Sequence, residues 1–130
     1  MANNNADIGT LATKIKNYTM LSNKNVVKVA LKEKLSSENF PFALNFARQD
    51  LSNKYENIYH HIGIYIYKVN ILEKFVNFDQ TKNEIEYRLE QLRALDNDIK
   101  INVALAKSSP IGIDTEEDYL ALKKIMEYKS

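Results

Sequence analysis

Several residue types are absent or scarce in this chain of 130 residues. It has no cysteine, three glycines and two prolines. Without a thiol there are no disulfide frameworks, thiolate metal sites or cysteine nucleophiles, and this composition fits a reducing compartment. No run of about 18 apolar residues occurs, and residues 1–5 do not begin a basic segment followed by an apolar run. We therefore expect a soluble, cytoplasmic protein that does not enter a membrane.

An excess of charge of one sign is also lacking. Lys and Arg total 18 against 17 Asp and Glu, a formal net charge of +1. So close a balance provides no overall field to attract a nucleic acid or an anionic membrane, and we expect neither as a partner. A length of 130 residues with 45% hydrophobic residues allows one modest core. We therefore expect a single structural unit.

Alternating hydrophobic residues predict the strands. Residues 27–31 and 42–46 alternate on either side of a polar cluster, which predicts two strands joined by a long hairpin loop. Residues 62–67 are β-branched and aromatic on both faces, as in a strand buried on both sides. Strict alternation in residues 99–105 predicts a further strand.

Helical spacing accounts for much of the remainder. Residues 71–76 and the charged run 82–95 each carry apolar residues at helical intervals. Thr115 can cap a last helix, with acidic residues in its first turn. Residues 8–15 fit either a helix or a strand. The resulting order of strands and helices is typical of an α/β fold.

The only two histidines, His60 and His61, adjoin the predicted buried strand. Neighbouring strand residues point to opposite faces, so these two do not converge on one metal ion. A single histidine at a strand end can instead line a ligand cleft. Tyr65 and Tyr67 share the face of His61 because all three are odd-numbered on one strand. Such a row is either part of the core or the wall of a polar pocket.

The polar residues Glu90, Gln91 and Asp114 are further candidates for a functional role. Glu90 and Gln91 lie in a charge-rich run whose simplest interpretation is a solvated helix face. Asp114 stands just before the predicted helix start, where a carboxylate either caps backbone amides or holds Mg²⁺ beside phosphates. The chain contains no glycine-rich phosphate loop and no nucleophile-elbow motif.

Taken together, five segments resemble consecutive motifs of the CMP-KDO synthetases, the 3-deoxy-manno-octulosonate cytidylyltransferases. Residues 61–67, 89–93 and 112–118 are similar in order and spacing to the C-terminal motifs of that family. Upstream, residues 6–11 are similar to its Ala-Asp-Met-Ala-Thr-Leu segment, and residues 25–31 to its Asn-Xaa-Val-Lys-Val-Val-Leu strand. The resemblance covers nearly the whole chain.

That resemblance implies an α/β fold of the nucleotide-diphospho-sugar transferase (Rossmann-like) type, a mixed sheet with flanking helices. Members of the family transfer CMP from CTP to the eight-carbon sugar acid KDO and release pyrophosphate, with Mg²⁺ as cofactor, in lipopolysaccharide synthesis. This chain would be the C-terminal part, concerned with sugar binding and dimerisation. The N-terminal half, whose loop holds the CTP phosphates, is absent from these 130 residues.

Half of such a sheet leaves an unpaired strand edge and an uncovered apolar face. We therefore expect a homodimer, or pairing with a separate N-terminal half, and little or no activity of the chain alone.

The resemblance also implies roles for individual residues. Arg48 would hold the sugar carboxylate or a phosphate as a bidentate fork. Asp114 would bind Mg²⁺ and act in catalysis. The remaining matched positions on the KDO side are His61, Tyr65, Glu90 and Gln91.

Other functions stay open on sequence alone. Ala47 stands where the family has serine, and Tyr87 where it usually has a second glutamate. The alternatives are a non-catalytic binding or assembly module that keeps the dimer-forming surface, a remnant of a decayed gene, and an α/β domain without KDO chemistry.

Overall fold

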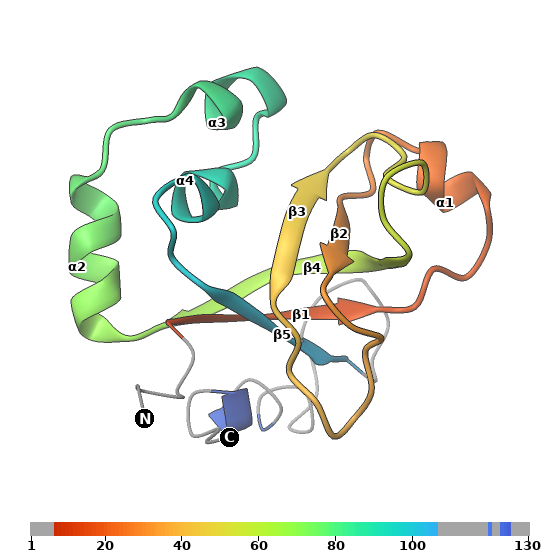
Figure 1. Cartoon of the computed structure of the whole chain (residues 1–130), viewed down its shortest axis with the longest axis horizontal. Helices are drawn as coiled ribbons and strands as arrows, with labels where there is room; N and C mark the ends of the chain where they lie inside the picture. The colour runs from red at the N-terminus through yellow and green to blue at the C-terminus, as the bar shows by residue number, and fades with distance from the viewer. Residues whose placement is uncertain (1–6, 107–119, 121–122, 126–130) are drawn as a thin grey trace.

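The computed structural model describes residues 7–106, 120 and 123–125. Within them, five strands form one mixed sheet in the order β3-β2-β4-β1-β5 (Figure 1). β1 and β5 are parallel, and the other neighbouring strands are antiparallel. The strands are β1 (Ile8–Thr13), β2 (Lys28–Leu31), β3 (Ala43–Ala47), β4 (Asn57–Tyr67) and β5 (Ile101–Leu105).

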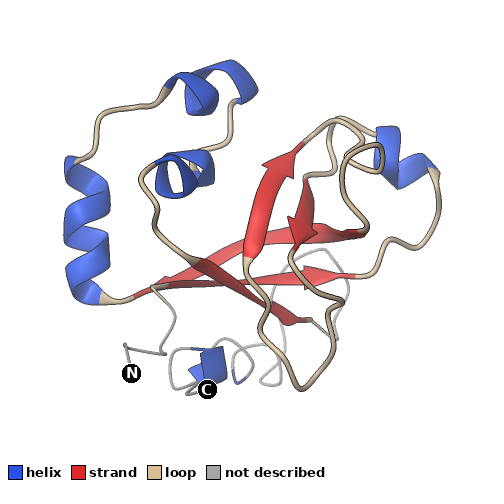
Figure 2. Cartoon of the chain, in the orientation of Figure 1, coloured by secondary structure: helices blue, strands red, loops and turns tan. Residues whose placement is uncertain are grey.

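Helices flank the sheet on both faces. After β4 the chain forms α2 (Val69–Asn77), α3 (Lys82–Tyr87) and α4 (Gln91–Asp96), which lie together to one side of the strands (Figure 2). Helix α1 (Thr19–Ser22) is a single turn between β1 and β2. On the opposite face, Ile125 packs against residues of β1, β4 and β5. This arrangement confirms the predicted α/β class with a mixed sheet.

The N-terminal stretch is the strand β1, so the strand alternative is the correct one. All six residues of β1 are buried, between β4 on one side and β5 on the other. A strand buried on both faces carries apolar residues at odd and even positions, which obscures the period of two. Residues such as Ile8 and Leu11 therefore mimic helical spacing.

The predicted hairpin and central strand are confirmed with small changes of length. β2 and β3 pair antiparallel, with Val29 opposite Phe46. β4 begins at Asn57, five residues before the predicted start at residue 62. The added residues pair with β2, where Lys28 lies opposite His60. In this extension polar and apolar residues occur on both faces of the strand, so residues 57–61 show no clear alternation in the sequence.

The prediction of one helix over residues 82–95 is wrong. Arg88 adopts a left-handed conformation with φ 57° and ends α3, and α4 begins three residues later. Thr81 and Glu84 form a capping box at the start of α3, and the Thr81 hydroxyl also donates to Asp96 of α4 at 2.6 Å. These bonds hold α4 against α3 as a compact helical hairpin.

The last helix predicted from Thr115 starts outside the described residues. Residues 120 and 123–125 are helical.

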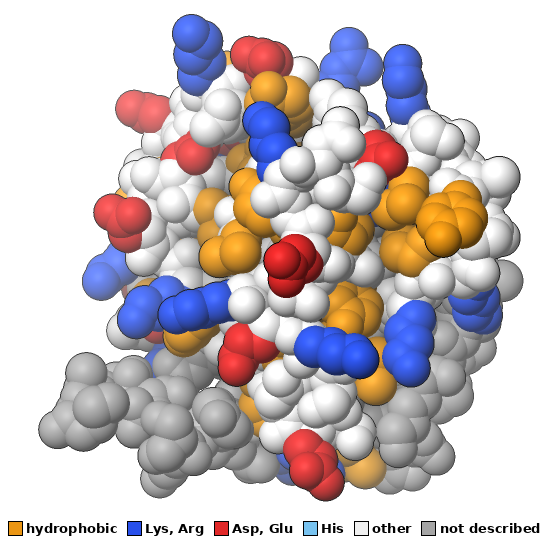
Figure 3. All heavy atoms as spheres, turned by 45° about the vertical axis from the view of Figure 1, so that its right-hand side comes forward, with side chains coloured by type: hydrophobic (Ala, Val, Ile, Leu, Met, Phe, Trp, Pro, Cys, Tyr) orange, Lys and Arg blue, Asp and Glu red, His pale blue; other side chains and the backbone are white. Residues whose placement is uncertain are grey.

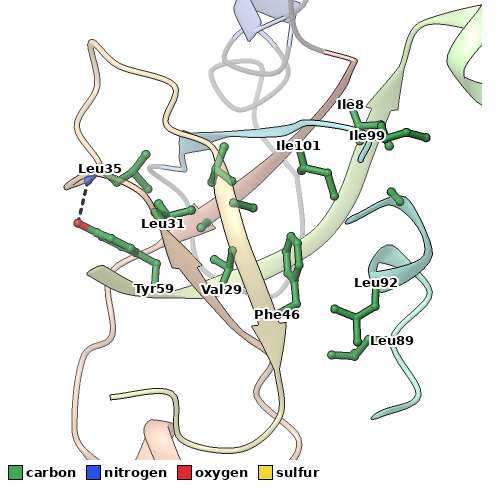
Figure 4. Packing of buried hydrophobic residues seen from close by; sticks show 14 of the residues in the cluster. Ile8, Val29, Leu31, Leu35, Phe46, Tyr59, Leu89, Leu92, Ile99 and Ile101 are labelled. Carbon is green, nitrogen blue, oxygen red and sulfur yellow. Dashed lines mark hydrogen bonds between the residues drawn. The ribbon is translucent and has the colours of Figure 1, made fainter. Parts of the chain in front are cut away.

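The largest core lies between the sheet and helices α2 to α4. Phe46 points from β3 toward Leu89 and Leu92, while Leu31, Leu35 and Tyr59 close the other end of the cluster (Figure 4). The Tyr59 hydroxyl accepts a hydrogen bond from the Leu35 amide at 2.9 Å, so its oxygen is paired despite burial. The remaining buried members include Ile8, Ala12, Val29, Ala43, Ile71, Phe75, Ala94, Ile99, Ile101 and Val103.

One sheet edge that the sequence predicts to be unpaired is partly covered. The segment before β3 forms a bridge between Phe42 and Asn102 of β5, and the Val103 amide donates to the Pro41 carbonyl at 3.0 Å. The sheet therefore folds back toward itself at one end. By contrast, Val69, Leu72 and Val76 of α2 are exposed, and their i, i+3, i+7 spacing makes them one apolar stripe on the outside of that helix.

Charged side chains of both signs lie on the one face of the molecule that Figure 3 draws. On the face in Figure 3, Lys and Arg side chains alternate with Asp and Glu around small hydrophobic groups. Among residues 7–106, 120 and 123–125 there is no helix with the length and apolar content needed to span a bilayer.

Phe46 is the residue on which we expect the core to depend most. Its side chain is 1% exposed, whereas Leu44 on the same strand is 47% exposed. Phe46→Ala should lower the free energy of unfolding by about 3 to 5 kcal/mol, because it leaves a cavity between sheet and helices. Leu44→Ala, the matched control, should change it by only about 0.5 kcal/mol. Urea denaturation of both variants measures the difference, and similar losses would contradict this view of the core.

Candidate functional site

The candidate site is built around His61, on the helix-covered face of β4. The imidazole is 6% exposed, and its Nε2 lies 2.9 Å from Oγ1 of the buried Thr10 on β1. Burial, and to a lesser degree the neighbouring His60, lowers the pKa of His61 to about 3. His61 is therefore an uncharged group at neutral pH.

An aromatic row extends from His61 along the sheet. Ring centroids are 4.9 Å apart for Phe46 and His61, 5.4 Å for His61 and Tyr65, 6.1 Å for Tyr65 and Tyr67, and 5.9 Å for Tyr67 and Phe75. The prediction that His61, Tyr65 and Tyr67 share one face is confirmed. Offset and tilted contacts at these separations favour aromatic pairs.

Arg93 of α4 lies over Phe75, the last ring of the aromatic row. Its guanidinium carbon lies 4.9 Å from the centroid of Phe75, and its Nε and Nη2 donate to the two carboxylate oxygens of Glu84 at 2.7 and 2.5 Å. This bidentate pair holds the pKa of Glu84 below its usual range. Because Glu84 is on α3 and Arg93 on α4, the pair fixes the two helices relative to each other and to the row.

Glu90 lies beside the tyrosines of the row. It occupies the junction between α3 and α4. Burial raises the pKa of Tyr65 well above its usual range, with smaller contributions from Tyr67 and from the charge of Glu90. Burial and then Glu90 also raise the pKa of Tyr67. Both phenols therefore stay protonated, and each keeps a hydrogen to donate.

Gln91 follows Glu90 as the first residue of α4 and is half-buried. The structure thus brings together three of the predicted residues, with His61 and Tyr65 in contact on β4 and Glu90 near Tyr65, and Gln91 follows Glu90 in the chain. An uncharged imidazole, a phenol, a carboxylate and an amide offer several donors and acceptors with one charge among them. Such a set is suited to a ligand with many hydroxyl groups.

Arg48 lies apart from these residues. It follows β3, and its Nη1 donates to the Lys24 carbonyl at 3.4 Å, toward the segment that leads into β2. Its own carbonyl accepts from the Nζ of Lys28, which is fully buried and also donates to the carbonyls of Asn23 and Val26 at 2.9 and 2.6 Å. Lys28 therefore ties the end of β3 to the start of β2 and fixes the backbone of Arg48.

His60 and His61 face opposite sides of the sheet. His60 pairs across to Lys28, and burial together with the charge of Lys28 lowers its pKa. In the part of the chain that the structure describes, no three His, Cys, Asp or Glu residues gather as metal ligands. Asp114, the predicted Mg²⁺ ligand, is outside that part.

A hollow of about 510 Å³ lies elsewhere, and Phe46 is among the residues that line it. This partly open cavity lies between β3, the loop 49–55 and helices α3 and α4. Its polar lining comes chiefly from Asn45, Asp50, Asn53, Lys54, Asn83 and Asp96. None of the five predicted site residues in the described part of the chain lines it. No sequence pattern predicts this cavity, because its residues come from β3, from a loop and from two helices that are distant in sequence.

Three residues that organise the site were missed from the sequence. Thr81 and Glu84 do carry a signal, since Ser or Thr followed three residues later by Glu is the pattern of a capping box. Thr10 has no comparable signal, because a single polar residue within an apolar strand does not reveal its hydrogen-bond partner.

With this geometry established, comparison with solved structures defines the class of fold. The chain superposes on a structure of CMP:2-keto-3-deoxy-manno-octonic acid synthetase complexed with CTP, with a TM-score of 0.68 and 23% identity, over 94% of this chain and 49% of that one. The mixed sheet with flanking helices is therefore an α/β fold of the nucleotide-sugar transferase type.

The family follows from the sequence comparison. The family model described as Cytidylyltransferase matches residues 1–101. The chain belongs to the cytidylyltransferase family.

Two curated relatives carry the name 3-deoxy-manno-octulosonate cytidylyltransferase. The protein from Bartonella tribocorum is 39% identical over 126 residues, covering 97% of this chain and 51% of the relative. The protein from Thermodesulfovibrio yellowstonii is 38% identical over 136 residues, again 97% of this chain and 51% of the relative. The chain spans about half the length of the curated relatives it matches.

The low pKa of His61 predicts how stability depends on pH. An unperturbed histidine has a pKa of about 6.5. Below that pH, His61 binds a proton in the unfolded chain but remains unprotonated in the folded chain. The contribution of neutral His61 to the free energy of unfolding is fully present above pH 6.5. It is lost as the pH falls toward the pKa of about 3 in the folded protein. The free energy of unfolding should therefore fall between pH 7 and pH 5, with a slope that approaches 1.4 kcal/mol per pH unit.

Urea denaturation across this range measures the slope. His61→Gln should flatten it, and the half-buried His60→Gln, as control, should flatten it less. An unchanged slope in His61→Gln would show that folding does not lower the pKa of His61.

Proposed function

We propose that this chain forms the sugar-acid side of a CMP-KDO synthetase, which joins CMP from CTP to KDO and releases pyrophosphate. The observation that carries the proposal is that His61 and Tyr65 lie in contact on one face of β4, while Glu90, from the junction of α3 and α4, is close enough to raise the pKa of Tyr65. These positions match the sugar-contacting positions of the family. The names of the curated relatives agree with that choice of substrate.

The chemistry of each group suits a sugar acid. Glu90 accepts hydrogen bonds from hydroxyls, and Gln91 both donates and accepts. Tyr65 donates from a phenol that burial keeps protonated. A neutral His61 adds no charge that would compete with the arginine for the sugar carboxylate.

Arg48 is the guanidinium we assign to that carboxylate or to a phosphate. A planar guanidinium binds either anion through two parallel hydrogen bonds. To do so it would give up one bond of 3.4 Å to the Lys24 carbonyl. Its backbone would stay in place, because Lys28 holds it.

Asp114 is the residue we assign to Mg²⁺. A bound magnesium ion offsets charge on the phosphates during transfer. The described residues provide no cluster of three ligands, so other ligands would come from the nucleotide, from water and from residues outside this set.

The complete activity would need the other half of the enzyme. The chain spans 51% of the relatives named above and lacks a phosphate-binding loop. We propose that it works as a homodimer or paired with an N-terminal half, in which the CTP phosphates are held.

The exposed stripe of Val69, Leu72 and Val76 favours a second candidate, a non-catalytic assembly module. An apolar stripe on the outer face of a helix is typical of a surface that packs against another chain. In such a module the stripe would be used without any transfer of CMP.

A reconstitution experiment tests the proposed function. The chain alone, given CTP, KDO and Mg²⁺, should release no pyrophosphate above a blank without enzyme. Adding a family-type N-terminal half should restore release of pyrophosphate. A chain that binds such a half but never restores turnover would contradict the proposed activity and favour the assembly module.

Two variants of the reconstituted enzyme separate the assigned roles. Asp114→Asn should lower the turnover number roughly a hundredfold, or about 3 kcal/mol, because a metal ligand stabilises charge at the transferred phosphorus. Gln91→Ala should instead raise KM for KDO roughly fivefold. This factor corresponds to about 1 kcal/mol, the contribution of one neutral hydrogen bond. Asn is also a good helix cap. Unaltered turnover and Mg²⁺ response in Asp114→Asn would therefore identify Asp114 as a cap only.

A further inference from the structure

Thr10 lies where the pairing of β1 with β4 becomes irregular. Thr10 is opposite Tyr65, but the next residue, Leu11, is opposite Ile62. Two residues of β4, at positions 63 and 64, are therefore extra and form a bulge. The Thr10 hydroxyl oxygen reaches into this bulge, 2.7 Å from the Ile64 carbonyl oxygen and 3.3 Å from that of Ile62.

The same hydroxyl contacts His61 and fixes which ring nitrogen carries hydrogen. A hydroxyl has one hydrogen to donate, and both carbonyl oxygens can only accept. The hydrogen of Thr10 therefore points to the nearer carbonyl, that of Ile64. Its oxygen is left to accept, so the Nε2 of His61 at 2.9 Å must be the donor.

The other ring nitrogen is then an acceptor without a partner. The Nδ1 of His61 makes no hydrogen bond to any described residue. Among the described residues, the only fully buried side-chain polar atom without a hydrogen-bond partner is Nδ1 of His60. The Nδ1 of His61 is therefore not completely buried, although the residue as a whole is only 6% exposed.

Few titratable groups lie close enough to the His61 imidazole to change its protonation. From β4 the titratable neighbours are His60 and Tyr65, and β3 and β1 bring Phe46 and Thr10, which do not titrate. Glu90 acts on Tyr65 rather than on the imidazole. With the ring uncharged, the position of its one hydrogen is the property that remains to be set.

We propose that Thr10 is a positioning residue that holds His61 as the tautomer with hydrogen on Nε2, so that Nδ1 accepts a hydrogen bond from a hydroxyl of the bound sugar acid. The role of Nδ1 rests on the proposed function, whereas the tautomer does not. The bulge in β4 contributes to this arrangement. The Ile64 carbonyl within it accepts the hydrogen of the Thr10 hydroxyl, which could otherwise be donated to the His61 ring.

Nitrogen-15 NMR of the histidine rings in the full chain tests the tautomer directly. The wild-type chain at pH 7 should show Nε2 as the protonated nitrogen of His61 and Nδ1 as the bare one. Thr10→Ser keeps the hydroxyl and should preserve this pattern. Thr10→Val removes it and should shift both nitrogen signals toward an average of two tautomers.

Thr13→Val is the matched control, because Thr13 is also buried on β1 but lies opposite His60. It should leave the His61 signals unchanged. A wild-type ring with hydrogen on Nδ1, or a Thr10→Val chain with the wild-type pattern, would overturn the proposal. The wild-type and Thr10→Ser spectra decide the matter even where Thr10→Val does not fold.

Titration with KDO separates the tautomer from the proposed function. Thr10→Val should bind KDO roughly tenfold more weakly than wild type and Thr10→Ser, as expected for one hydrogen bond. If the tautomer is as proposed but KDO does not bind the wild-type chain, the choice of ligand is wrong while the role of Thr10 stands. If KDO binds equally well to wild type and Thr10→Val, Nδ1 is not the acceptor for the sugar.

Discussion

The described structure depends above all on the antiparallel pairing of β1 with β4. β1 lies between β4 and β5, and β4 lies between β1 and β2, so this contact joins the hairpin side of the sheet to the parallel side. Both cores need it, because Ile8 of β1 faces helices α2 to α4 and Leu11 faces Ile125. Without this pairing, the hairpin side would be joined to β5 chiefly through the bridge between Phe42 and Asn102 and the bond from Val103 to Pro41.

The same pairing places the candidate site. Alternation along β4 puts His61, Tyr65 and Tyr67 on the helix-covered face, and the two-residue bulge preserves that alternation while adding a carbonyl for Thr10. The helices then complete the arrangement. The bidentate pair of Glu84 and Arg93 locks α3 to α4, and Glu90 is thereby held beside the tyrosines.

Sequence patterns predicted those parts of the fold that a period of two or a run of apolar residues determines. The hairpin, β4 and β5 were predicted, and so was the common face of His61 and Tyr65, because strand geometry alone sets it. The division of residues 82–95 was not, since it depends on a left-handed Arg88 and on bonds from Thr81 to a residue fifteen positions away.

The predicted binding residues differ in the same way. The structure gathers the two on β4 and the one that precedes α4, which regular elements position. The place of Arg48 depends instead on two long-range contacts that no local sequence pattern predicts. Lys28 binds its backbone carbonyl, and its guanidinium donates to the Lys24 carbonyl. The cavity that Phe46 helps to line is likewise formed by segments distant in sequence. The roles of the six predicted residues stay predictions, and Asp114 lies outside the described part of the chain.

The most direct test of the central claim is to locate where the full chain binds a sugar acid. Amide and side-chain NMR signals would be followed as KDO is added to millimolar concentration, since half a cleft binds weakly. The account predicts shifts concentrated at His61, Tyr65, Glu90 and Gln91. Shifts confined to the residues around the 510 Å³ cavity, such as Asn53 and Asn83, or no shifts at all, would contradict it.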